Sequence, residues 1–260
     1  MHDISIPRLL FSYALLLFPF AIILRLRVPM LRSVAVSIFR MTIQLILVGL
    51  YLQFIFQLDH AVVNLVWLLV MVVVADASVL SGCGLRLREV GGPLFVGMLA
   101  GTLIPVLAFT AGVLGLPNVV EAQYVIPITG MILGNCLRAD MIGLRTFYGT
   151  LRSQRAVYEQ TLAEGASLRE AVTPWFRDAV QASLAPTAAT MATIGLVALP
   201  GMMTGVILAG ADPFVAIKYQ IAIMIAIFSG TSLTVYLGIR LTLRTAFDGY
   251  GNLREAVFRS

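Results

Sequence analysis

RSQRAVYEQTLAEGASLREAVTPWFRDAVQASLAP, residues 152–186, is the one long polar stretch in a chain that otherwise passes from one apolar block to the next. Charges of both signs alternate with Ala, Leu and Val at helical spacing, which indicates amphipathic helix. Gly165 is a typical helix stop, and Ser167 stands three residues before Glu170, the spacing of a capping box. The stretch is predicted to be a helix, a tight turn and a second helix that dock another protein. An ordinary long loop is the alternative.

The composition around this stretch is that of an integral membrane protein. Hydrophobic residues make up 59% of the 260 residues and charged residues 12%, about half the charge of a typical soluble domain. The net charge of +5 does not indicate nucleic acid binding, because the 17 Arg and one Lys are dispersed beside apolar blocks. The two cysteines, Cys83 and Cys136, are far apart in sequence and indicate neither a disulfide framework nor a zinc site.

Seven apolar blocks approach the roughly 20 residues that a helix needs to cross a bilayer. These predicted spans cover 9–24, 34–56, 62–80, 93–116, 124–148, 182–209 and 214–243. We therefore expect an all-α, multi-pass protein with a single membrane domain over residues 1–260. The sixth block contains Pro186, Pro200, Gly201 and Gly205, which favours a broken or flexible helix.

Arginine sets the expected orientation. It occurs in the loops after spans one, three and five and in the C-terminal tail, whereas the alternate loops, QLDHAV, LPNVVEAQ and AGADP, contain no Arg or Lys. Because basic loops stay in the cytoplasm, this pattern predicts seven spans with the N-terminus outside and the C-terminus inside. The polar segment 152–181 is then cytoplasmic.

Small residues recur at four-residue spacing in the predicted spans, as Gly97/Gly101, Gly130/Gly134 and Gly201/Gly205. Such faces allow helix backbones to approach closely, so packing is the favoured interpretation and pore lining the alternative. No internal repeat is evident, which argues against the two-fold repeated architecture of many secondary transporters.

Several polar residues in the spans are candidates for a transport pathway, since polar groups are costly in hydrocarbon. Each has a structural alternative, namely snorkelling, hydrogen bonding between helices or gap filling by methionine. Asp76 and Asp140 lie near predicted inner ends of spans three and five, and Arg138 and Asp140 do not share a helical face. The pathway candidates are Gln44, Asn135, Arg138, Met202, Met203, Lys218 and Gln220.

No catalytic set is present. The two histidines, His2 and His60, fall at or beyond the expected outer surface, and the sequence contains no Ser/His/Asp set, no HExxH and no Walker A motif. The protein is therefore not expected to be an enzyme. If ATP drives transport, another chain must bind it.

Four stretches resemble one family. The stretches are RMTIQLILVGLYLQFIF (40–56), VIPITGMILGN (125–135), EQTLAEGAS (159–167) and GLVALPGMMTGVILAGADPFVAIKYQI (195–221). They are similar to the permease subunits of Fet-type bacterial iron-export ABC transporters, a group that includes plant aluminium-tolerance membrane proteins. The resemblance extends from about residue 30 to 240. It implies a permease in the bacterial inner membrane that exports iron or another metal, with the metal-binding residues unknown.

The resemblance also implies partners and a role for the polar segment. Two permeases would pair with two copies of a cytoplasmic ATPase, which binds ATP and Mg²⁺, so no cofactor is expected on this chain itself. The segment would be the coupling helix, with contact residues Glu159, Glu164, Gly165, Ala166, Ser167 and Glu170. Glu159 stands six residues before Gly165, as in the importer motif EAAxxxG, but Gln160 and Thr161 replace both alanines. A stand-alone, ion-coupled carrier that uses a buried acid, best Asp76, is the alternative.

Overall fold

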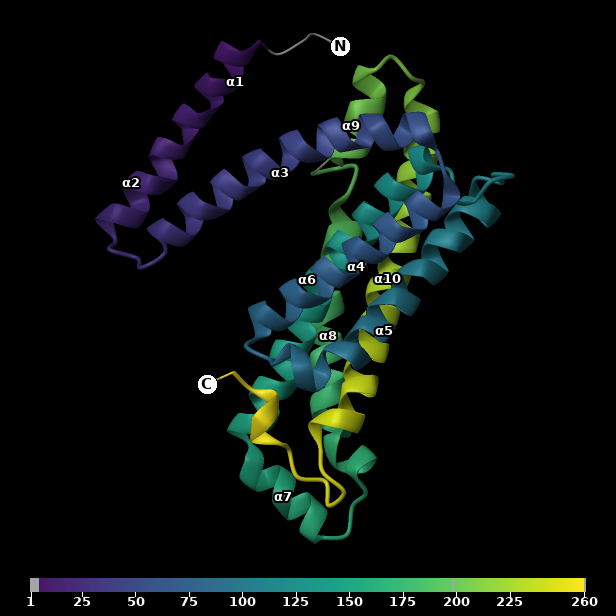
Figure 1. Cartoon of the computed structure of the whole chain (residues 1–260). Coiled ribbons are helices and arrows are strands. Elements are labelled where there is room, and N and C mark those ends of the chain that lie inside the picture. Colours follow the sequence, from purple (N-terminus) through teal and green to yellow (C-terminus); the bar gives the residue numbers. More distant parts are fainter. Residues whose placement is uncertain (1–4, 198, 260) are drawn as a thin grey trace. The chain divides into compact units, whose positions relative to one another are not determined.

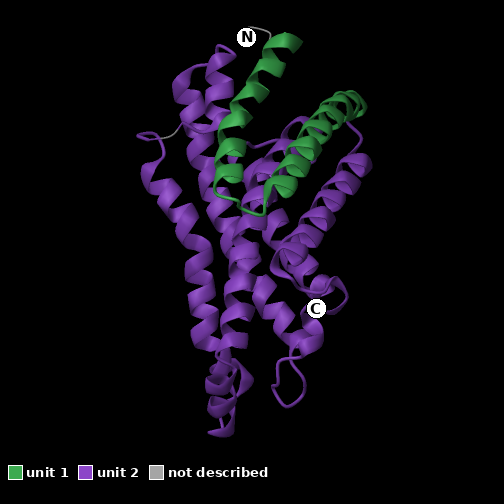
Figure 2. Cartoon of the chain, turned by 90° about the vertical axis from the view of Figure 1, so that its left-hand side faces the viewer, with its two compact units in different colours: residues 1–58 green, residues 59–260 purple. Residues whose placement is uncertain are grey.

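The computed structural model describes residues 5–197 and 199–259, and these residues fold into helices with no β-sheet among them. Their contacts divide the chain into two compact units, Met1–Leu58 and Asp59–Ser260 (Figure 2). The all-α class predicted from composition is confirmed, while a single domain over residues 1–260 stays a prediction.

The first unit contains two long helical segments. α1 (Ile6–Ser12), a 3-10 turn (Tyr13–Leu16) and α2 (Leu17–Arg25) follow one another without a gap, and α3 (Leu31–Leu58) returns. The chain reverses where Arg27 has a positive φ of 52° and Pro29 follows. The Tyr13 and Thr42 hydroxyls are hydrogen-bonded at 2.6 Å and join the two segments.

The second unit is a bundle of long helices with a short helical hairpin at one end (Figure 1). A π-helical turn, Ala108–Val113, extends α5, and a 3-10 turn, Glu255–Val257, lies near the C-terminus. The helices are α4 (Ala61–Cys83), α5 (Leu87–Leu107), α6 (Ala122–Ser153), α7 (Arg155–Ala163), α8 (Leu168–Thr193), α9 (Gly201–Leu208) and α10 (Pro213–Ala246).

Six helical segments among the described residues are long and apolar enough to cross a membrane, one fewer than the sequence predicted. They are Ile6–Arg25, Leu31–Leu58, Ala61–Cys83, Leu87–Val113, Ala122–Ser153 and Pro213–Ala246. The expected sixth span, 182–209, is divided between the end of α8 and the short α9. Helix α8 ends at Thr193 because Gly195 has a φ of +86°, and Pro200 opens α9 in an extended conformation. The expected break is therefore present. The orientation of the spans stays a prediction.

Helices α5 and α10 pack with their backbones in close contact. A Cβ atom on Gly97 would lie 2.9 Å from the Gly238 nitrogen, and one on Gly101 would lie 2.7 Å from the Thr234 nitrogen. This pair of glycines therefore packs helices, as expected. Gly134, Gly201 and Gly205 have no such neighbour, and a Cβ on Gly130 would meet one methionine at ordinary contact distance. The same spacing thus has different consequences in different helices.

Helices α4 and α6 run side by side in the same direction. At one end Asn64 donates a hydrogen bond of 2.8 Å to the Val120 carbonyl, which precedes α6. At the other end the Cys83 thiol donates to the Met141 carbonyl at 3.3 Å. The parallel alignment brings residues of α4 to the same depth as residues about 58 positions later in the chain.

Candidate functional site

The polar segment forms a helical hairpin, as predicted. Helix α7 ends at Ala163, Gly165 turns the chain with a φ of +97°, and Ser167 caps α8. The Ser167 hydroxyl accepts the Glu170 backbone N–H at 3.4 Å, while the Glu170 carboxylate accepts the Ser167 backbone N–H at 2.9 Å. The Ser167 hydroxyl also donates to the Glu170 carboxylate at 2.6 Å, and this bond, together with the one from the Ser167 N–H, holds the pKa of Glu170 below its ordinary value.

The six residues predicted to contact an ATPase have different positions in this hairpin. Gly165, Ser167 and Glu170 build the turn itself, and Ala166 is half-buried against the core. Glu159 is exposed and pairs with Arg155 at 2.6 Å, and Glu164 is exposed and accepts a hydrogen bond from Gln160 at 2.9 Å. Their role in binding a partner stays a prediction.

The inner face of the hairpin is closely packed against the bundle. Tyr158 is 1% exposed, and its ring lies edge-on to Trp175 of α8 with centroids 5.9 Å apart. The Trp175 indole donates a hydrogen bond of 2.8 Å to the Gln154 side chain at the α6–α7 junction. Burial raises the pKa of Tyr158 to about 12, so its hydroxyl stays a donor, and it donates to the Gly251 carbonyl. The hairpin is therefore held firmly at its base.

Residues 247–259, the C-terminal strap, connect the hairpin to the α4–α5 turn. The Gly251 carbonyl of the strap accepts the hydrogen bond from the Tyr158 hydroxyl. The Val257 carbonyl accepts one from the Arg86 N–H, and the Arg259 N–H donates one to the Gly84 carbonyl, both at 2.8 Å. In Figure 1 the yellow segment after α10 turns back beside α7. The strap thus ties together elements far apart in sequence.

Charged contacts reinforce the strap. Glu255 pairs with Arg152 at 3.4 Å and with Arg155 at 3.3 Å, and the Arg152 guanidinium lies 4.6 Å from the centre of the Phe258 ring. The sequence analysis did not identify this role for the C-terminal residues, because separate arginines and one glutamate carry no signal of pairing across a hundred residues.

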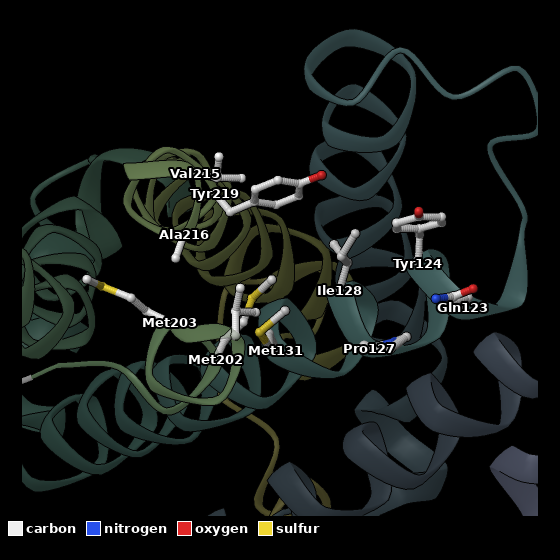
Figure 3. A pocket seen from close by; sticks show the side chains of 11 residues that line it. Gln123, Tyr124, Pro127, Ile128, Met131, Met202, Met203, Val215, Ala216 and Tyr219 are labelled. Atoms are coloured by element: carbon white, nitrogen blue, oxygen red, sulfur yellow. The ribbon is translucent and has the colours of Figure 1, made fainter. Parts of the chain in front are cut away.

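A cavity of about 560 Å³, the methionine cavity, lies between α6, α9 and α10 (Figure 3). Met202 and Met203 line it and extend in different directions from α9, and their place in a transport pathway stays a prediction. The structure adds Met131, Tyr124 and Tyr219, which the sequence analysis missed. The lining is mostly apolar, so the cavity offers thioethers and few oxygen ligands.

The other predicted pathway residues do not join this cavity. Asn135 and Arg138 line a separate cavity of about 150 Å³ between α6, α8 and α10. Gln220 follows Tyr219, a residue of the methionine cavity, in sequence; it is buried, and its Oε1 atom has no protein hydrogen-bond partner. Lys218 and Gln44 are exposed. The structure therefore does not gather the seven candidates into one site.

Two acidic residues are buried in the bundle. Asp76 of α4 is 4% exposed and Asp140 of α6 is 1% exposed, and both have carboxylate oxygens without a protein hydrogen-bond partner. Arg138 is exposed, so it and Asp140 do occupy different faces, as predicted. Within the described residues, no three His, Cys, Asp or Glu side chains lie close enough together to hold a metal ion by themselves.

Comparison with known proteins places the chain in a family. The model of the uncharacterised protein family UPF0014 matches residues 6–247. The probable iron export permease protein FetB of Escherichia coli is 31% identical over 95% of this chain and 94% of its own length. The UPF0014 membrane protein STAR2 of rice is 34% identical over 84% and 75% of the two chains. The protein ALUMINUM SENSITIVE 3 of Arabidopsis thaliana is 32% identical over 86% and 81%. No solved structure matches the chain.

The bacterial relative and the plant relatives confirm the resemblance that four stretches of sequence indicated. The apolar helices agree with the membrane location that the relatives' names state. The chain therefore belongs to the UPF0014 family of multi-pass membrane proteins.

Proposed function

We propose that the protein is the membrane-spanning permease subunit of an ABC transporter that exports iron or another metal ion. Two copies would assemble with two copies of a separate ATPase, which supplies the energy of ATP hydrolysis. The match to the probable iron export permease over nearly the full length of both chains supports permease function and metal cargo.

The observation that carries the proposal is the way the α7–α8 hairpin joins the bundle. Helix α6 runs unbroken for 32 residues from the methionine cavity to the hairpin and passes Asp140 on the way. The packed Tyr158–Trp175 base and the C-terminal strap prevent the hairpin from bending freely. A force on the hairpin would therefore move α6, and through the strap the α4–α5 turn, as a connected body. Such a lever is what coupling to an ATPase requires.

In the proposed mechanism, ATP binding closes the ATPase dimer and displaces the hairpin, and α6 transmits this displacement to the cavities along its length. The α6 helix forms part of both the methionine cavity and the cavity lined by Asn135 and Arg138. Tilting it would therefore enlarge one opening and narrow the other. This is alternating access driven from one end of the bundle.

The exposed face of α7 is the expected contact. Val157 is 57% exposed, an unusual position for an apolar side chain in a segment proposed to be cytoplasmic, and Gln160 and Glu164 are exposed along the same helix and its end. Apolar side chains at the centre of a polar rim are typical of protein interfaces. We therefore assign Val157 to the centre of the contact and Glu164 to its rim.

Copurification with the cognate ATPase tests the assignment. Val157→Glu and Glu164→Arg should each reduce the amount of ATPase that copurifies with the permease, because the first buries a charge and the second reverses one. Glu121→Arg is the matched control, since Glu121 precedes α6 at the end opposite to the hairpin. The 32 residues of α6 separate its two ends by roughly 48 Å. Undiminished copurification of both hairpin variants would refute the coupling assignment.

A stand-alone, ion-coupled carrier is the second candidate, favoured by the buried Asp76 and Asp140. A carrier of that kind transports its cargo in proteoliposomes with an ion gradient and no ATPase. Cargo movement that requires ATP and the partner subunit would reject it.

A further inference from the structure

A layer of polar side chains crosses the centre of the bundle in the second unit. Its members come from four helices and are at most 4% exposed. We call this set the polar layer, and it consists of Asp76 of α4, Thr102 of α5, Cys136 and Asp140 of α6, and Thr234 of α10.

These residues lie within about one and a half helical turns of one another along the bundle. A Cβ on Gly130 would lie 3.5 Å from the Met71 side chain, and one on Gly82 would lie 2.6 Å from the Met141 side chain, so each residue of α4 is level with the residue 58 or 59 positions later in α6. Asp76 is therefore level with residue 135, and Asp140 lies five residues farther along, about 7.5 Å at the rise of an α-helix. Helix α10 is placed similarly, because a Cβ on Gly238 would lie 4.0 Å from the Asp140 carboxylate.

Helix α5 completes the layer. Gly101 faces Thr234, so the adjacent Thr102 is brought to the same level. A Cβ on Gly230 of α10 would lie 3.3 Å from the Cys136 sulfur, and one on Gly238 would lie 4.0 Å from the Asp140 carboxylate, so both of these α6 side chains face α10. The five side chains are therefore buried where these packed helices meet.

Four oxygen atoms of this layer lack a protein hydrogen-bond partner: Oδ1 of Asp76, Oγ1 of Thr102, and both carboxylate oxygens of Asp140. Within the described residues, neither carboxylate forms an ion pair, because all the ion pairs involve the hairpin and the strap. Buried polar groups are normally hydrogen-bonded, and buried charges are paired or bind a cation. Two unpaired acids and an unpaired hydroxyl in one layer are thus arranged for a ligand of positive charge.

We propose that the polar layer binds one hard cation through carboxylate and hydroxyl oxygens. Oxygen ligands favour ions such as Mn²⁺ and Mg²⁺, and the layer contains two carboxylates and two hydroxyls but one thiol and no histidine. The inference rests on the proposed function, for which it supplies the missing cargo site: α6 carries Asp140 and continues to the hairpin, so a displacement of the hairpin is transmitted to the site.

Binding of Mn²⁺ to the purified permease in lipid nanodiscs, without ATPase, tests the proposal. Electron paramagnetic resonance of free Mn²⁺ should report one bound ion per wild-type chain. Asp140→Asn and Asp76→Asn keep the size of each side chain but remove its charge, and each should weaken binding at least tenfold. Asp178→Asn, at an exposed position of α8, should bind as the wild type does. Cys136→Ser should retain binding, because the site depends on oxygen ligands.

The opposite results are equally clear. If the wild type binds no Mn²⁺, or if Asp140→Asn binds it unchanged, the layer is not a cation site. A layer that takes up protons on acidification but no Mn²⁺ also overturns the proposal. Thermal unfolding of each Asn variant shows whether the fold is retained, and the two positions give independent readings. Because ATPase copurification depends on the hairpin and not on Asp140, the cation site can fail while the proposed function stands.

Discussion

Replacing Gly101 by Ala should separate α5 from α10, because the two backbones leave no room for a methyl group. The new Cβ would lie 2.5 Å from Thr234 Cγ2, 2.7 Å from its nitrogen and 2.9 Å from its Cα. The side-chain methyl can rotate, but the nitrogen and the Cα belong to the helix backbone. Restoring an ordinary contact of 3.4 Å to the nitrogen requires about 0.7 Å of displacement.

The expected cost follows from two opposing effects. Overpacking of a closely packed interface costs about 1–3 kcal/mol, and the upper part of that range applies here since backbone atoms must move. Ala is favoured over Gly within a helix by about 0.5–1 kcal/mol. The clash is the larger effect, and the net destabilisation should be about 1–2 kcal/mol.

Gly134→Ala is the matched control. It makes the same substitution at the second glycine of a four-residue pair, but a Cβ there has no neighbour within 4 Å. Helix propensity alone then predicts stabilisation by about 0.5–1 kcal/mol. Reversible unfolding in mixed detergent and SDS micelles measures both variants. Equal stability of the two would refute the close approach of α5 and α10, and Gly101→Ala should also weaken Mn²⁺ binding, since it displaces Thr234.

Four further predictions concern the hairpin and the strap. Ser167→Ala should destabilise the start of α8 by about 1 kcal/mol, measured by hydrogen exchange of its first amides. The folded-state pKa of Glu170 is lowered, so the stability that its carboxylate contributes is present above the ordinary pKa and is lost as the pH falls through the lowered value. The difference in unfolding temperature between the wild type and Glu170→Gln should therefore shrink from pH 7 to pH 3. A constant difference would contradict the capping contact. Tyr158→Phe removes a buried hydrogen bond to Gly251 and should lower the free energy of unfolding by about 1 kcal/mol, which faster proteolysis of the strap would report. Glu255→Gln removes exposed ion pairs and should change the free energy of unfolding by less than about 1 kcal/mol, even at low salt.

Local features were predictable from the sequence because their interactions span only a few residues. The capping box of Ser167 and Glu170 and the turn at Gly165 depend on neighbours within three or four positions, and both are present. The apolar blocks likewise predicted all six helical segments near their observed places, with bounds that differ by a few residues at most ends. Hydrophobicity along one segment is sufficient for such predictions.

Block 182–209 shows where this reasoning fails. Its apolar content met the requirement for a span, yet helix α8 begins in the polar hairpin and ends at Thr193, and α9 follows as a separate short helix. Pro200 and the glycines indicated a break, but composition does not determine how the chain continues after it. Length and hydropathy therefore overestimated the number of continuous spans.

The composition, the apolar blocks and the local caps by themselves determined that this protein is a helical membrane protein with a polar helical hairpin. The tertiary structure alone decided which polar residues are buried near one another. Asp140 was one acid near a helix end until the parallel alignment of α4 and α6 and the contact of Gly101 with α10 brought it within about one and a half helical turns of Asp76, Thr102 and Thr234. That alignment arises from close packing between helices. The depth at which each residue lies depends on shape complementarity among residues far apart in the chain, and the periodicity within one helix does not predict it.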